Sequence, residues 1–155
     1  MRKFLLYITC FLALSLLFSS CGEEQSRIPF CQVSILIDLR GHDGDLVAGQ
    51  VKTFDEGRGW AGCRGVVVIN TGGEFLAFDM ACPDCIWVGG VVIQHRFQAQ
   101  QIPDALECSQ CSNRFNPLDG RPMQGSLTRY TLRQYQVSIQ TTDLGGNPLT
   151  LSVHN

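Results

Sequence analysis

Two closely spaced pairs of cysteines are the residues of this sequence most able to do chemistry. Cys82 and Cys85 flank a Pro-Asp dipeptide, and Cys108 and Cys111 flank a Ser-Gln dipeptide further along the chain. Two cysteines three positions apart on a turn can direct both sulfurs at one centre, and two such turns together make a tetrahedral site of four thiolates. Zinc and iron are the metals that such a site suits. The spacing therefore predicts a metal centre, with disulfides as the alternative.

The start of the chain has the composition of an export signal. Two basic residues precede an apolar stretch over residues 4–18, and two serines stand directly before Cys21. The stretch is about 15 residues long, which is shorter than the roughly 20 that a membrane-spanning helix needs. This order of residues predicts a signal peptide over residues 1–20 that is removed on export.

The cleavage region resembles the lipobox of bacterial lipoproteins. Leu17-Phe18-Ser19-Ser20-Cys21 carries the resemblance, with Phe18 where Leu is usual. In such proteins the cysteine is lipidated and becomes the mature N-terminus. The resemblance implies a lipid on Cys21, a polar linker over residues 21–29, and attachment to a membrane of the bacterial cell envelope, on its periplasmic side or at the cell surface. The alternatives are an ordinary secretory peptide, which leaves Cys21 as a plain thiol, and an uncleaved anchor.

Export changes how the cysteines are interpreted. The chain has eight of them, and six remain once Cys10 leaves with the signal and Cys21 carries the lipid. Disulfides persist in exported proteins, so they compete with metal binding as the role of the two pairs. The other two, Cys31 and Cys63, stand at the starts of two predicted strands. They could form a structural disulfide or remain as two buried free thiols.

Length and charge limit the function further. The chain has 155 residues, which suits one domain, predicted over residues 30–155. It holds 12 Lys and Arg against 14 Asp and Glu, for a net charge of −2. This balance lacks the basic excess that neutralises nucleic-acid phosphates, so we expect no nucleic-acid partner.

Several stretches have the pattern of strands. Alternation of apolar and polar residues, typical of a strand with one buried face, covers residues 33–40, 134–140 and 149–153. Two β-branched and aromatic runs, over residues 66–69 and 75–80, are joined by Asn70-Thr71-Gly72-Gly73. Glycines can supply the positive φ that a tight turn needs, so the sequence predicts a hairpin here and a second one at the C-terminus.

The rest of the chain is less regular. Residues 86–93 are apolar with two central glycines, which favours a bent strand or a pair of loops over a helix. Residues 97–107 have a helix-friendly composition that Pro103 divides. Residues 43–62, with five glycines, are interpreted as an irregular surface excursion or ragged hairpin. Because no stretch keeps a helical period, the sequence predicts an all-β fold, a small sandwich or barrel of roughly eight to ten strands.

The residues around the cysteine pairs form a further pattern. Asp79-Met80-Ala81-Cys82-Pro83 follows the first hairpin, and the second pair runs on into Ser112-Asn113-Arg114-Phe115 and then Asp119-Gly120. Over about residues 65–139 this resembles the Rieske iron–sulfur domain, a small β domain with Cys-x-His and Cys-x-x-His loops at one tip that hold a 2Fe-2S cluster. Cys85 stands one place beyond the first histidine position, and Cys111 replaces the second. The chain is thus similar to an all-cysteine relative of that domain, a form associated with exported proteins of Bacteroides-like bacteria.

The resemblance implies a cofactor and a function. A 2Fe-2S cluster would be held by Cys82, Cys85, Cys108 and Cys111, and the protein would pass single electrons to a redox partner without catalysing a reaction of its own. Two thiolates in place of two neutral imidazoles add negative charge, which moves the potential from roughly −150 to +300 mV toward about −400 mV. If the four cysteines bind zinc instead, they form a closed structural site. The protein is then a zinc- or disulfide-stapled binding or scaffold module without redox activity.

The remaining candidates carry weaker signals. His42 stands beside Asp43 and Asp45, where a cation site is possible in principle but a solvated turn is the preferred interpretation. His95 is expected to be an ordinary surface or interstrand histidine. Trp87 is expected to fill the core, with shielding of the metal loop as the alternative. No Ser or Cys forms a recognisable motif with a His, so the sequence does not indicate nucleophilic catalysis.

Overall fold

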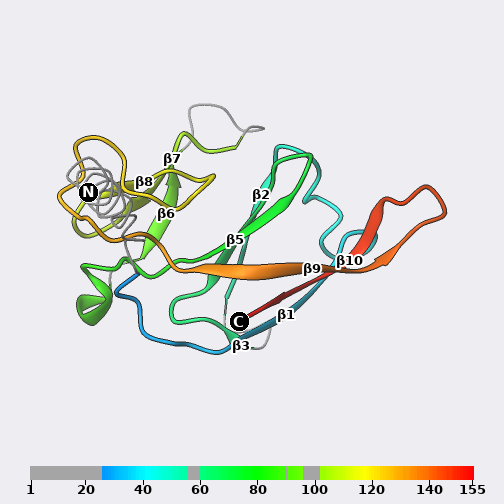
Figure 1. The fold of residues 1–155 in the computed structure, drawn as a ribbon, viewed down its shortest axis with the longest axis horizontal. Helices are drawn as coiled ribbons and strands as arrows, with labels where there is room; N and C mark the ends of the chain where they lie inside the picture. The colour runs from blue at the N-terminus through cyan, green and yellow to red at the C-terminus, as the bar shows by residue number, and fades with distance from the viewer. Residues whose placement is uncertain (1–25, 56–59, 90, 96–101) are drawn as a thin grey trace, which may run out of the picture.

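Two antiparallel sheets make up the described part of the protein (Figure 1). The computed structural model describes residues 26–55, 60–89, 91–95 and 102–155. The larger sheet has the strand order β2-β4-β5-β9-β10-β1-β3 and the smaller one the order β6-β7-β8. The predicted signal peptide and Cys21 lie outside the described residues. In the part that is described, no helix combines the length and the apolar character needed to cross a membrane.

The larger sheet contains the predicted hairpins. Its strands are β1 (Val33–Asp38), β2 (Val51–Phe54), β3 (Trp60–Ala61), β4 (Val66–Asn70), β5 (Phe75–Asp79), β9 (Gln134–Thr142) and β10 (Pro148–His154). The first predicted hairpin is β4 and β5, whose turn has Gly72 at a φ of 91°. The second is β9 and β10, closed by a turn in which Gly146 has a φ of 80°. Both predictions are confirmed.

The smaller sheet consists of β6 (Val92–His95), β7 (Ala105–Cys108) and β8 (Arg114–Phe115). A short 3-10 helix, η3 (Ile86–Val88), precedes β6 and ends at Gly89, which has a φ of 79°. With ten strands in the described residues, the predicted all-β fold class is confirmed.

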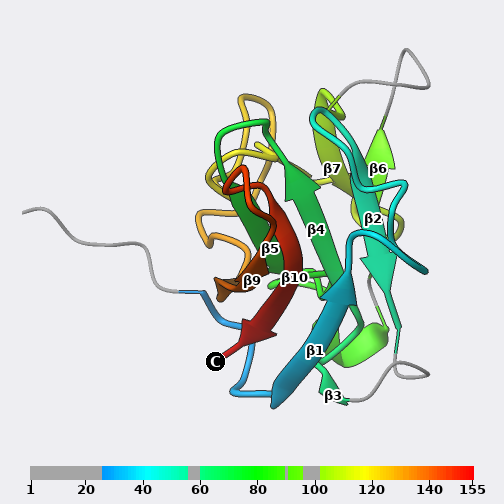
Figure 2. The same ribbon diagram turned by 90° about the vertical axis from the view of Figure 1, so that its right-hand side faces the viewer.

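The larger sheet encloses the first of two main cores. Figure 2 shows its strands wrapped around a common interior as a nearly closed barrel. Every strand of this sheet contributes a side chain to that interior. The buried members are Val33, Ile35, Ile37, Leu46, Phe54, Ala61, Val66, Val68, Ala77, Tyr135, Leu151 and Val153. The strict alternation of buried and exposed residues in β1 reflects its single buried face.

The second core lies on the opposite face of β4 and β5. Val67, Ile69, Leu76 and Phe78 point to this side and pack with Leu106 and Phe115 of the smaller sheet, with Leu132, and with three of the four paired cysteines. Strands β4 and β5 are therefore covered on both faces, which explains why residues 66–69 form an uninterrupted apolar run. This second core holds the cysteine loops against the barrel.

Two sequence-based interpretations of loop segments need correction. Residues 43–62 are not simply irregular, because they contain β2 and β3, which form the two edges of the larger sheet. The apolar residues of β2, Val51 and Phe54, stand three positions apart and do not alternate with polar ones. The regularity of β2 comes from pairing with β4, from Val51↔Ile69 to Phe54↔Val66. Residues 86–93 begin as a 3-10 helix and end in β6.

The segment with helix-friendly composition also folds differently. Residues 96–101 lie outside the described part, and the end of the segment forms β7, which pairs with both β6 and β8. Local composition was overridden here by a tertiary partner on each side of the strand.

Candidate metal centre

The first cysteine loop is a direct continuation of β5. That strand ends at Asp79, and Cys82 and Cys85 follow within six residues. The backbone N–H of Cys85 donates to the Cys82 carbonyl at 3.2 Å, which closes the turn between the two cysteines. Pro83, inside this turn, is buried. The strand and the turn together fix the direction in which both sulfurs point.

The second cysteine loop is the turn between β7 and β8. Cys108 ends β7, and its N–H donates to the Asn113 carbonyl at 2.9 Å. The Ser112 N–H donates to the Cys108 carbonyl at 3.0 Å, and Ser112 has a φ of 55°. Positive φ is uncommon for a residue with a Cβ and here reflects the tightness of the turn.

The two loops meet because the smaller sheet packs on the barrel. The N–H of Ser109 donates to the Val91 carbonyl at 3.0 Å, and Ala81 forms a bridge with Val91. Val91 therefore contacts the backbone of both loops. Chain segments more than twenty residues apart in sequence lie at the same end of the molecule (Figure 1).

Four cysteine sulfurs converge at this end. The Sγ atoms of Cys82, Cys85, Cys108 and Cys111 all lie within 4.8 Å of one another. Those of Cys82 and Cys111, which come from different loops, are 3.7 Å apart. All four thiols are free, and Cys111 is exposed whereas the other three are buried. The structure thus brings the two predicted cysteine pairs together, and these four cysteines are free thiols that form no disulfide.

The environments of the sulfurs differ. Burial raises the pKa of the Cys82 and Cys85 thiols, that of Cys85 to about 12, and neighbouring thiols add to this. Burial also acts on Cys108, but backbone N–H groups of Cys111 and Gln110 outweigh it and lower the pKa of that thiol. The Gln110 N–H lies 3.4 Å from the Cys108 sulfur. Since metal binding requires thiolates, it must displace the protons of the Cys82 and Cys85 thiols.

One buried side chain connects the loops. The amide of Asn113, which is 4% exposed, donates through Nδ2 to Asp84 of the first loop at 3.2 Å. Its Oδ1 accepts from the Leu127 N–H at 2.9 Å. Asn113 thus joins both cysteine loops to the segment at Leu127. The sequence placed Asn113 in the second loop but did not reveal these contacts.

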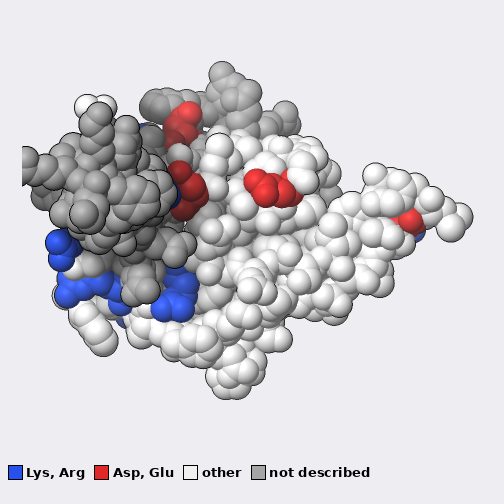
Figure 3. Space-filling model, in the orientation of Figure 1, with Lys and Arg blue, Asp and Glu red and all other residues white. Residues whose placement is uncertain are grey.

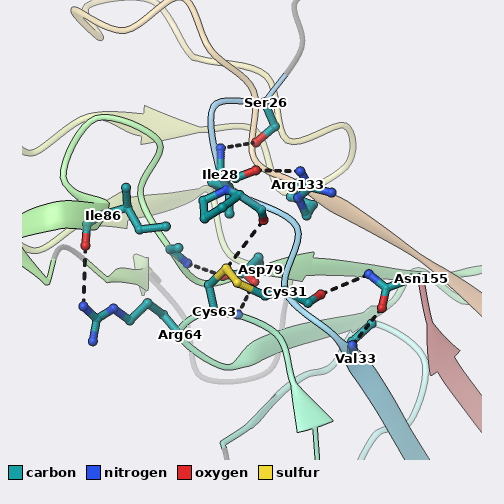
Figure 4. The surroundings of a disulfide bond; sticks show 12 residues. Ser26, Ile28, Cys31, Val33, Cys63, Arg64, Asp79, Ile86, Arg133 and Asn155 are labelled. Carbon is teal, nitrogen blue, oxygen red and sulfur yellow. Dashed lines mark hydrogen bonds between the residues drawn. A yellow bond between two sulfur atoms is a disulfide. The ribbon is translucent and has the colours of Figure 1, made fainter.

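A second polar cluster lies just before the first loop (Figure 4). Asp79 is fully buried and accepts hydrogen bonds from the Cys63 N–H at 2.7 Å, the Ala81 N–H at 2.7 Å and the Tyr135 hydroxyl at 2.6 Å. Burial, followed by the bond to Asp79 and its charge, raises the pKa of Tyr135 well above 10. The carboxylate thus ties β9 and the Cys63 turn to the start of the metal loop.

Cys31 and Cys63 form a disulfide, with their Cα atoms 5.2 Å apart. The bond connects the segment before β1 to the turn between β3 and β4 (Figure 4). Of the two roles that the sequence left open for this pair, the structure has the disulfide.

The weaker candidates fall elsewhere. The carboxylates of Asp43 and Asp45 form salt bridges with Lys52 Nζ, at 3.1 and 2.5 Å. Both carboxylates are therefore engaged in ion pairs beside the His42 turn. His95 ends β6, and its side chain lies outside the described part. Trp87 is 86% exposed, so the prediction that it fills the core is wrong. It follows Cys85 closely and η3 directs it to solvent.

The surface around the loops is distinctive. Trp87, Val88 and Leu127 are exposed apolar residues, and each stands within a few positions of a loop residue or of a residue bonded to one. On the face shown in Figure 3, basic side chains gather toward the end of the molecule that carries the smaller sheet, and acidic side chains lie at the same end. Arg27 and Arg129 lie 4.8 and 5.2 Å from the centre of the Tyr130 ring.

The donor set can be tested against the groups it could hold. Four thiols that converge within 4.8 Å fit a single tetrahedral ion, because zinc and iron both accept four thiolates. They fit a two-iron cluster less well. In such a cluster, sulfurs bound to different irons lie farther apart than sulfurs bound to the same iron, because the distance between the two irons is added. The fold and the site define a small all-β protein with four converging cysteines that could hold a metal ion.

Comparison with known proteins adds two similar structures. No protein-family model matches the sequence, and no curated protein matches it. One similar chain belongs to a structure described as the complex of reduced oxygenase and oxidized ferredoxin in carbazole 1,9a-dioxygenase, with 17% identity over 80% of this chain and 93% of that chain, and a TM-score of 0.46. Another is the ferredoxin of carbazole 1,9a-dioxygenase from Nocardioides aromaticivorans IC177, with 19% identity over 80% and 97%, and a TM-score of 0.44. These scores carry no argument about function, which therefore depends on the cysteine site.

Proposed function

We propose that this protein is an exported, Rieske-like electron carrier whose iron–sulfur centre is held by Cys82, Cys85, Cys108 and Cys111. The convergence of four free sulfurs within 4.8 Å is the observation that carries the proposal. Iron bound by four thiolates supplies a one-electron couple. The chain's own residues bind the metal, exclude water from three of its ligands and leave the fourth at the surface.

The exposure of the site suits electron transfer. Three ligand sulfurs are buried in the second core, whereas Cys111 is exposed and so brings one edge of the centre to the surface. Trp87 and Leu127 add exposed apolar area near that edge. The basic side chains that gather at this end in Figure 3 would attract an acidic part of a redox partner.

A direct experiment uses the full chain purified without oxygen. We expect iron bound at the four cysteines, charge-transfer absorption in the visible range, and reversible bleaching on reduction by one electron. Cys82→Ser and Cys111→Ser should lose the bound iron and the absorption. Ser109→Ala is the matched control, because Ser109 is exposed and lies between two ligands of the same loop. A colourless protein with stoichiometric zinc would contradict the electron-transfer function.

A structural zinc site is the second candidate. The same four sulfurs are close enough to surround one Zn²⁺, and four thiolates leave no position for a catalytic water. The centre would then stabilise the two loops, and the protein would be a binding or scaffold module. Chelation of zinc should in that case lower the melting temperature, with no redox change to accompany it.

We also propose that a lipid on Cys21 attaches the protein to a membrane of the bacterial cell envelope. The lipobox-like segment before Cys21 supports this proposal. Cys21→Ala should move the protein from the membrane fraction to the soluble fraction and abolish incorporation of labelled palmitate. The same distribution for wild type and variant would refute the lipid anchor while leaving the metal site untouched.

A further inference from the structure

We propose that the four cysteines hold a single metal ion and not the two-iron cluster that the Rieske resemblance implies. This proposal rests on the proposed function in one respect only, which is that the metal is iron. It concerns how many ions the four thiolates share.

The separations of the sulfurs carry the argument. Around one tetrahedral ion with metal–sulfur bonds of about 2.3 Å, every pair of sulfurs lies about 3.8 Å apart. The observed separation of 3.7 Å between the Cys82 and Cys111 sulfurs matches this value, and it joins two different loops. No pair among the four exceeds 4.8 Å. In a two-iron cluster, two ligands bind each iron, so sulfurs on different irons must lie well beyond the single-ion distance.

The loops are also held at this spacing by contacts that the sulfurs do not make. The Asn113 amide bonds to Asp84, and the Ser109 N–H bonds to the Val91 carbonyl, so each contact joins the second loop to the first or to the segment that follows it. Three of the ligands pack within the second core. Opening the loops for a second iron and two bridging sulfides would break these contacts and expose buried surface.

The sequence change relative to the Rieske pattern agrees with this geometry. Both loops here have two residues between their cysteines, and the Cys85 N–H donates to the Cys82 carbonyl across the first turn. In the second turn, the Gln110 N–H points at the Cys108 sulfur. Two similar turns that each present a pair of thiols make a symmetrical tetrahedron around one ion.

The test is reconstitution of the metal-free full chain without oxygen, with ferrous iron alone or with ferrous iron and sulfide. We expect ferrous iron alone to restore one iron per chain, with no acid-labile sulfide, and added sulfide to change neither value. The oxidised protein should then show the electron paramagnetic resonance signal of an isolated high-spin ferric ion. Cobalt(II) titration should reach its end point at one ion per chain with the spectrum of a tetrahedral thiolate site. Asn116→Ala, outside both cysteine loops, should behave as the wild type in each measurement.

The outcomes separate this inference from the proposed function. Two irons and two sulfides per chain, with the signal of a coupled iron pair on reduction, would overturn the single-ion site and leave electron transfer standing. One tightly bound zinc, in a protein that does not take up iron, would support the single-ion site and overturn electron transfer. Failure of cobalt(II) to bind at one equivalent would overturn the single-ion site whatever metal the cell supplies.

Discussion

Asn113 reaches three segments of the metal centre with one amide. It sits in the second cysteine loop, donates to Asp84 in the first, and accepts from the Leu127 N–H. Because the side chain is buried, water cannot replace a hydrogen bond that it loses, so each lost bond lowers the folding stability. We therefore treat Asn113 as a positioning residue for both cysteine loops.

Asn113→Ala should weaken metal retention. Residues that orient metal ligands typically contribute about 10–100-fold in affinity, and we expect a loss in that range here. Competition with a chelator, followed by metal analysis, measures it. Asn116→Ala is the matched control, since the Asn116 amide oxygen accepts from Leu118 within its own turn. Equal metal retention in wild type and Asn113→Ala would show that the loops keep their positions without this contact.

Tyr135→Phe should destabilise the fold through Asp79. The buried carboxylate would lose one of its three hydrogen bonds, a cost of about 1–3 kcal/mol. The folded pKa of Tyr135 is raised above its unfolded value of about 10 by burial and by Asp79, so the hydroxyl stabilises the fold below pH 10 and loses this effect as the pH rises further.

Chemical denaturation at several pH values measures both effects. The difference in unfolding free energy between wild type and Tyr135→Phe should be constant near neutral pH and shrink above pH 10. Tyr130→Phe is the control, because its exposed hydroxyl pairs with Arg129, and it should change stability by less than about 0.5 kcal/mol. A difference that persists at high pH would contradict the role assigned to the hydroxyl.

At the scale of elements, the turn between β3 and β4 decides how the barrel meets the metal loop. Gly62 has a φ of 68°, and a Cβ there would lie 2.5 Å from Asp79 Oδ2 and 2.7 Å from the Tyr135 hydroxyl. The turn can approach the buried carboxylate only because this residue has no side chain. The next residue, Cys63, then donates its N–H to Asp79.

Gly62→Ala should therefore cost about 2–4 kcal/mol of stability, from backbone strain and from displacement of the Asp79 cluster. Thermal and denaturant unfolding measure it. Gly73→Ala, in the β4–β5 turn, is the matched control, because its φ is not positive and a Cβ there meets no atom within 4 Å. Similar unfolding free energies for the two variants would mean that the Gly62 turn adjusts without strain.

At the scale of the whole molecule, two different crosslinks stabilise two regions. The Cys31–Cys63 disulfide closes a loop of sequence separation 32 and attaches the segment before β1 to the barrel. A crosslink over that length lowers the conformational entropy of the unfolded chain, which raises the free energy of unfolding by about 3–4 kcal/mol. The metal, by contrast, would crosslink the two loops at the other core.

Reducing the disulfide should lower the melting temperature while the metal stays bound. The metal-bound thiolates are already reduced, so a non-chelating reductant should not remove their ion. Melting curves with and without that reductant, together with metal analysis, check this. Cys31→Ser/Cys63→Ser should reproduce the lower melting temperature without reductant. Loss of the metal on reduction would show that the two crosslinks stabilise one cooperative unit.

Local sequence patterns predicted those features of the fold that depend on residues close together in the chain. The alternation in β1, the turn glycines of both hairpins and each of the two cysteine pairs could be inferred, because each depends on residues a few positions apart. The strand β2 could not be inferred, since its apolar residues do not alternate and its pairing with β4, which is distant in sequence, defines it. Trp87 was misplaced because hydrophobicity alone cannot show that η3 turns it to solvent.

By itself, the sequence determined which atoms could bind a metal and where the two main hairpins would form. Only the tertiary structure decided how close the two cysteine loops come, because that distance follows from packing the smaller sheet on the outer face of β4 and β5. The same packing buried Asn113 and brought its amide to Asp84. The spacing of four sulfurs, and with it the choice between one ion and two, is a long-range property that no local pattern encodes.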